Sequence, residues 1–118
     1  MTNDQRYNLE ERTAKFGENG IKLGQKIPET SITKPLINQF IKCVTSTGAN
    51  YCEADDAESK EDFRHKIGIC KKESREAKHF LRMLVVAVPE LKGGIETLWQ
   101  EAKELNLIFN KIYQKVKK

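Results

Sequence analysis

Lysine and arginine side chains recur between residues 60 and 88 at spacings that place them along one side of a helix. The intervals are mostly three, four and seven residues, and with the adjoining Lys72 the candidate nucleic-acid-binding set is Arg64, Lys71, Lys72, Arg75, Lys78 and Arg82. A cationic stripe on a rigid helix can follow phosphates and release their counterions. The alternative is a solvated face whose cations pair with nearby acids. Few aromatic residues interrupt the stripe, so stacking on single-stranded bases is not expected.

Three polar residues in the preceding segment form a second candidate group. Ser46, Asn50 and Glu53 follow one another at intervals of four and three residues beside an apolar seam. Polar groups near a core must find partners or destabilise it. We expect a basic residue of the next helix to pair with Glu53. A structural hydrogen-bond cluster is therefore favoured over a binding site for Asn50 and Glu53.

Metal and catalytic motifs are weak in this sequence. A di-metal bundle needs two Glu-x-x-His pairs, and Glu76 with His79 provides one. His65 and His79 have no cysteine beside them on their helix face, which disfavours zinc. The acidic run 53–58 could hold a divalent cation, although a solvated turn explains it as well. Cys70 lies in an apolar seam, where a thiol is unreactive. We expect no metal, no cofactor and no enzymatic activity.

Charge is uneven along the 118 residues, which carry a net charge of +4. Residues 1–59 hold 7 basic and 9 acidic residues, whereas residues 60–118 hold 14 and 8. A basic half suggests an anionic partner, although it also improves solubility. Three cysteines without a C-x-x-C motif indicate free thiols in a reducing cytoplasm. The polar segment 1–9 argues against a signal peptide, and the longest apolar run, 84–88, is too short to span a membrane.

These residues must be positioned by helices, because apolar residues recur alternately every four and three positions. The two clearest seams are Phe63, Ile67, Cys70, Ser74, Ala77, Leu81, Leu84, Val88 and Leu91, Ile95, Leu98, Ala102, Leu105, Phe109, Ile112, Val116. Two less regular seams precede them, so helices are predicted at about 8–27, 34–56, 60–88 and 89–116. Short connections make neighbouring helices antiparallel. We predict a single all-α domain, 1–118, folded as an antiparallel up-down-up-down four-helix bundle; three helices with a hairpin is the weaker alternative.

Local signals mark the expected helix ends. Asn8 with Glu11 and Ser59 with Asp62 have the spacing of N-terminal caps. Pro89 is expected to open the last helix.

Two further features bear on packing and assembly. All seven glycines fall within predicted helices, and close approach of a neighbouring helix is most plausible at Gly17, Gly20 and Gly24. The alternative is that the glycines have no packing role. Large or apolar residues off the seams indicate either a wide core or an oligomer interface. These residues are Phe80, Met83, Ala87, Trp99, Leu107 and Ile108.

One segment carries a family resemblance. Residues 46–54 read Ser-Thr-Gly-Ala-Asn-Tyr-Cys-Glu-Ala and are followed by Ser59-Lys60, Asp62-Phe63 and the stretch 71–84. Together they resemble the bacterial four-helix-bundle family encoded in intervening sequences of 23S rRNA genes, whose members are often labelled as a small ribosomal protein. That family is similar to the accessory variability proteins of diversity-generating retroelements. Asn50 and Glu53 match the family pattern.

The resemblance implies an up-down bundle that assembles into a homo-oligomeric ring, with a pentamer as the expected size. The similar accessory variability proteins form basic barrels that bind nucleic acid and a reverse transcriptase, and the resemblance supplies no catalytic residues. We therefore expect a non-enzymatic, cytoplasmic ring that binds nucleic acid, structured RNA or an RNA–protein complex first, through the basic face of the third helix. The alternative is an adaptor oligomer that binds a protein partner without touching nucleic acid.

Overall fold

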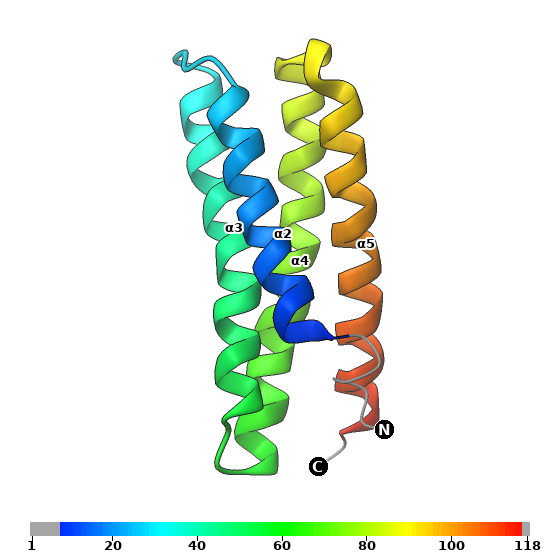
Figure 1. Ribbon diagram of the computed structural model, residues 1–118. Helices are drawn as coiled ribbons and strands as arrows, with labels where there is room; N and C mark the ends of the chain where they lie inside the picture. Colours follow the sequence, from blue (N-terminus) through cyan, green and yellow to red (C-terminus); the bar gives the residue numbers. More distant parts are fainter. Residues whose placement is uncertain (1–7, 117–118) are drawn as a thin grey trace.

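The computed structural model describes residues 8–116 and contains no strand within them. Its elements are α2 (Leu9–Lys26), α3 (Thr33–Asp55), α4 (Lys60–Ala87), the short 3-10 helix η1 (Pro89–Leu91) and α5 (Lys92–Lys115). Successive helices run in opposite directions (Figure 1). The predicted all-α, antiparallel four-helix bundle is confirmed, and η1 occupies the start of the segment predicted as the fourth helix.

Each helix packs against two neighbours, and the contacts between α2 and α5 are the sparsest. The turn between α2 and α3 lies at the same end of the bundle as η1, and the turn between α3 and α4 lies at the opposite end (Figure 1). The bundle measures 44 × 24 × 19 Å. Consecutive helices therefore form two hairpins, α2–α3 and α4–α5, joined along the α3–α4 contact.

The predicted seams form the core. Among the largest fully buried side chains are Phe16, Phe40, Tyr51 and Phe109. Some seam residues are polar, but their hydroxyl groups are hydrogen-bonded within the helix. Thr47 and Ser74 each donate to the backbone carbonyl oxygen four residues earlier at 2.8 Å. The period of 3.5 residues keeps every seam on the inner face of its helix.

The predicted caps have opposite outcomes. Ser59 Oγ accepts a hydrogen bond from the Asp62 backbone N–H at 3.0 Å, which confirms the cap of α4. Asn8 precedes α2 but makes no side-chain cap bond, so that prediction is wrong. Its φ of 50° places it in the left-handed region, whereas capping requires extended backbone.

The close approach predicted for the α2 glycines is present. A Cβ atom on Gly20 would lie 2.5 Å from Val44 Cγ2, and one on Gly17 would lie 3.2 Å from the Val44 carbonyl oxygen. Both positions therefore allow α2 to lie directly on α3. Each glycine lowers helix propensity by about 1 kcal/mol relative to alanine, but it allows the two helices to pack closely.

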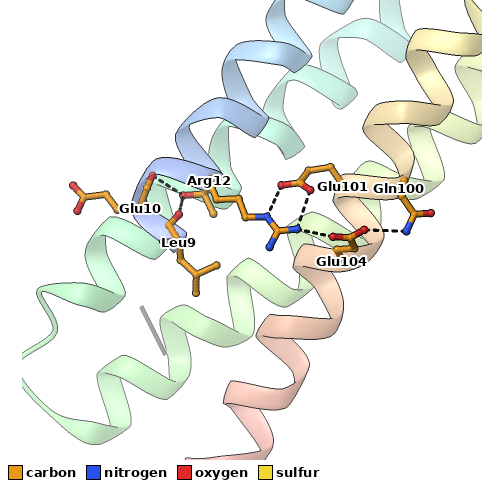
Figure 2. A network of polar contacts seen from close by, with 7 residues as sticks. Leu9, Glu10, Arg12, Gln100, Glu101 and Glu104 are labelled. Atoms are coloured by element: carbon orange, nitrogen blue, oxygen red, sulfur yellow. Dashed lines mark hydrogen bonds and ion pairs between the residues drawn. The ribbon is translucent and has the colours of Figure 1, made fainter. Parts of the chain in front are cut away.

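One polar network joins the first and last helices. Arg12 of α2 reaches Glu101 and Glu104 of α5, and Gln100 donates to Glu104 Oε2 at 3.2 Å (Figure 2). The Arg12 side chain is 26% exposed. The hydrogen bonds that Arg12 donates to Glu101 and Glu104, with the attraction of both carboxylates, outweigh desolvation, so the pKa of Arg12 is raised.

No helix within residues 8–116 is long and apolar enough to cross a bilayer. The prediction about a signal peptide depends mainly on residues 1–7, which lie outside the described residues.

Candidate nucleic-acid interface

Four of the six predicted nucleic-acid-binding residues gather in one surface depression. Lys72, Arg75, Lys78 and Arg82 of α4 line it together with Trp99 of α5. The depression has a volume of about 460 Å³, and Glu76 and His79 complete its wall. Helical spacing explains the arrangement, because residues three, four and seven apart share one face.

The cations of this depression are available to a ligand. Within residues 8–116, none of its four lysine and arginine side chains takes part in an ion pair. Lys78 Nζ lies 5.5 Å from the centroid of the Trp99 ring, and Lys103 Nζ lies 5.7 Å from it. The half-buried indole therefore attracts two ammonium groups over its ring by cation–π interaction.

Arg64 and Lys71, the other two predicted residues, lie elsewhere. The Arg64 Cζ atom is 3.7 Å from the centroid of the Tyr113 ring, and Lys71 Nζ is 4.5 Å from it. Arg64 Nη1 also donates to Tyr113 Oη at 3.0 Å. Gly68 leaves room for this ring, since a Cβ atom there would lie 3.1 Å from Tyr113 Cε1. These two cations serve the α4–α5 contact, so the predicted stripe divides into two parts.

Trp99 was missed as a site residue because the sequence analysis assigned it only to the off-seam apolar set. The structure shows it half-buried against the core, as are Phe80 and Ile108, whereas Leu107 is exposed. No local sequence signal identifies Trp99, because its partner depends on the register of the α4–α5 hairpin. In the contacts Arg64–Tyr113, Lys71–Asn106 and Lys78–Trp99 the two residue numbers add up to 177. An antiparallel hairpin imposes such a constant.

The Ser46–Asn50–Glu53 group is engaged in local and inter-helix bonds. Asn50 Nδ2 donates to the Ser46 carbonyl oxygen at 2.9 Å. Glu53 Oε1 lies 2.6 Å from Lys66 Nζ of α4, which is the pairing with a basic residue that we expected. The hydrogen bond that Lys66 donates to the Glu53 carboxylate raises the pKa of Lys66. Glu53 also borders a depression of about 610 Å³ at the α3–α4 turn, beside Asp56 and Glu58 of the acidic run.

A third group joins residues that the sequence analysis treated separately. Cys43 of α3 faces Glu73 and Glu76 of α4, and one potential ligand atom from each lies within 4.8 Å of the others. Cys43 Sγ donates to Glu76 Oε1 at 3.9 Å. Burial, followed by repulsion from the two carboxylates, raises the pKa of Cys43 to about 12. Its separation from Glu76 by 33 residues concealed this cluster from any motif search.

Glu73 is the unusual member of this group. It is 8% exposed, and within the described residues its Oε1 atom is buried without a hydrogen-bond partner. A buried polar group left without a partner costs roughly 1–3 kcal/mol of stability. Such a group calls for a functional explanation.

The comparisons with known proteins bear on the fold. No protein-family model matches the chain, and no curated protein matches it. A solved structure from Bacteroides thetaiotaomicron is similar to it, with a TM-score of 0.79 at 24% sequence identity. The match covers 89% of this chain and 97% of that one. That protein is described as one of unknown function from the S23 ribosomal protein family.

This likeness shows that the four-helix architecture occurs in a second protein over nearly its full length. The ribosomal label of that protein agrees with the label that the sequence resemblance implies.

Proposed function

We propose that this protein is a non-enzymatic nucleic-acid-binding bundle of the family encoded in 23S rRNA intervening sequences, and that it acts in the cytoplasm. The observation that supports the proposal is the set of four cations in the α4–α5 depression that form no ion pair within residues 8–116. One carboxylate, Glu76, borders the same depression, so its formal charge remains strongly positive. The expected ligand is structured RNA, alone or within an RNA–protein complex.

The dimensions of the depression suit a phosphate backbone. At a rise of about 1.5 Å per residue, the Cα atoms of Lys72 and Arg82 are separated by about 15 Å along α4. Several phosphates of one strand can lie within that length. Arg75 and Arg82 can each hold a phosphate through two parallel hydrogen bonds.

Trp99 favours backbone contact over base stacking. Its ring already has the ammonium groups of Lys78 and Lys103 over it. Proteins that bind single strands instead present free aromatic faces to successive bases. We therefore expect duplex or folded RNA to bind better than an unstructured strand.

We further propose that the chain forms a homo-oligomeric ring, with five subunits as implied by the resemblance. Exposed apolar side chains on three helices support this proposal: Ile21 of α2, Val86 of α4 and Leu107 of α5. In a ring, one surface of each subunit contacts a different surface of the next subunit. It would also present several basic depressions together, and such multivalency raises affinity without new contacts.

The binding test is fluorescence anisotropy with a labelled RNA hairpin, a duplex DNA and an unstructured strand, titrated at several salt concentrations. We expect RNA affinity to fall linearly in a plot of log affinity against log salt. The double variant Arg75→Glu/Arg82→Glu should weaken binding at least about tenfold and reduce the salt slope by about 2. The control, Lys22→Glu/Lys26→Glu, makes the same charge change at exposed positions of α2.

Equal losses in the two double variants would show that net charge drives binding, and the proposed surface would then be wrong. An absence of binding at low salt would overturn the nucleic-acid function itself. Light scattering coupled to gel filtration tests the ring, which a monomer at tens of micromolar would contradict.

An adaptor role is the second candidate. The exposed apolar groups Ile32, Val86 and Leu107 favour it, because such groups also mark protein-binding surfaces. This role predicts an oligomer that shows no salt-dependent RNA binding and copurifies with a defined protein partner. Loss of that partner in Leu107→Lys, with the helical content kept, would assign the surface.

A further inference from the structure

We propose that Cys43, Glu73 and Glu76 form a binding site for one divalent cation, with zinc as the preferred ion. The site lies between α3 and α4 and opens at Glu76, which also borders the basic depression. This inference is independent of the proposed nucleic-acid function, because none of its three ligands belongs to the cationic set.

Geometry provides the first support. Glu73 and Glu76 are three residues apart on α4, so both carboxylates project from the same side of that helix. Cys43 approaches from α3, and the three potential ligand atoms lie within 4.8 Å of one another. Small rotations of the two glutamate side chains would bring these atoms to the separation found around a single ion.

The buried Oε1 atom of Glu73, which has no hydrogen-bond partner among the described residues, provides the second support. This atom is sealed from solvent, although the side chain borders the cluster. A purely structural acid in a helix interface would be expected to pair with a donor. A cation held between Cys43 and Glu76 would satisfy this atom directly.

The donor set distinguishes among cations. One sulfur and two carboxylate oxygens suit zinc, which accepts thiolate and carboxylate ligands in tetrahedral geometry. Magnesium and calcium prefer oxygen donors alone. The thiol would release its proton to solvent on binding, and the resulting thiolate and two carboxylates would coordinate the ion. Water would complete the fourth position on the exposed side of Glu76.

The experiment uses Co²⁺ as a spectroscopic substitute and Zn²⁺ as the competing ion. Co²⁺ bound by a thiolate gives a ligand-to-metal charge-transfer band in the near ultraviolet, which carboxylates alone do not give. We expect this band to saturate at about one equivalent per chain, with a Kd on the order of 1 μM or below. Added Zn²⁺ should remove it. Zn²⁺ should also raise the melting temperature, since an ion bound only to the folded state stabilises that state.

Variants locate the ion. Cys43→Ser should abolish the band, and Glu73→Gln should weaken Zn²⁺ affinity at least about tenfold while keeping the side-chain shape. The matched control is Cys52→Ser, which removes an exposed thiol from the same helix and should leave the band intact. Circular dichroism of each apo variant would verify that the helices persist.

Two results would overturn the proposal. A band lost in Cys52→Ser but retained in Cys43→Ser would assign the ion to a surface thiol. Zn²⁺ binding that is only millimolar, or that is unchanged in folded Glu73→Gln, would show that the buried carboxylate is not a ligand.

Discussion

Arg12 of α2 and Glu101 of α5 form a bidentate ion pair that joins the first and last long helices of the bundle. Arg12 Nε lies 2.7 Å from Glu101 Oε2, and Arg12 Nη2 lies 3.0 Å from Glu101 Oε1 (Figure 2). A third contact joins Arg12 Nη2 to Glu104 Oε1 at 2.7 Å. The pair lies where the helix contacts of the bundle are sparsest, so it closes the bundle between its first and last helices.

We predict that Arg12→Gln lowers the free energy of unfolding by about 1 kcal/mol, because paired donors on partly buried carboxylates exceed ordinary surface pairs. For a domain of this size the melting temperature should fall by about 4 °C. The effect should shrink at high salt, which screens the pair. The control is Lys15→Gln, which breaks an exposed pair with Glu11 and should change stability little. Equal effects of the two substitutions would contradict the role of Arg12.

The second prediction concerns acid pH. Hydrogen bonds from Gln100 and then Arg12 lower the pKa of Glu104 below its ordinary 4.5. Its stabilising effect is therefore complete above pH 4.5 and is lost as the pH falls through the lower folded-state pKa. NMR titration of the Glu104 carboxyl carbon should show this shift. Gln100→Ala and Arg12→Gln should each move the pKa upward, and no movement in either variant would be inconsistent with this contact.

The third prediction concerns thiol reactivity. Burial is the largest cause that raises the pKa values of Cys43 and Cys70, each to about 12, whereas Cys52 is exposed. At pH 8 a thiol of that pKa is ionised to only about one part in ten thousand. One thiol per chain should react rapidly with a disulfide reagent, and Cys52→Ser should remove that phase. Denaturant should expose all three. Two fast thiols in the native chain would contradict the burial of Cys43 and Cys70.

The fourth prediction compares two glycines. Gly20→Ala should destabilise the fold by about 1 kcal/mol, because overpacking against Val44 outweighs the gain in helix propensity. Val44 is fully buried and β-branched, so it cannot rotate away cheaply. Gly93→Ala meets nothing within 4 Å and should stabilise α5 by about 0.5–1 kcal/mol. Urea unfolding of both variants tests this contrast; a stabilised Gly20→Ala would show that α2 can shift away from α3.

The local sequence was enough to predict which segments form helices and which side chains lie in the core. The seam from Ile67 to Leu84 is buried at every predicted position, because a side chain's place around a helix depends only on its residue number. The cap formed by Ser59 and Asp62 was predictable for the same reason, since it involves only four consecutive residues. Asn8 was not, because a cap also requires a backbone conformation that its residue type does not impose.

The sites were only half predictable. The sequence by itself determined that Lys72, Arg75, Lys78 and Arg82 share one helix face, because helical spacing is a local property. Only the tertiary structure decided that Trp99 joins them, that Arg64 contacts Tyr113, and that Cys43 meets two glutamates. Those contacts depend on how far each helix slides and rotates against its neighbour. That offset results from close packing of the whole core, which no single segment of sequence encodes.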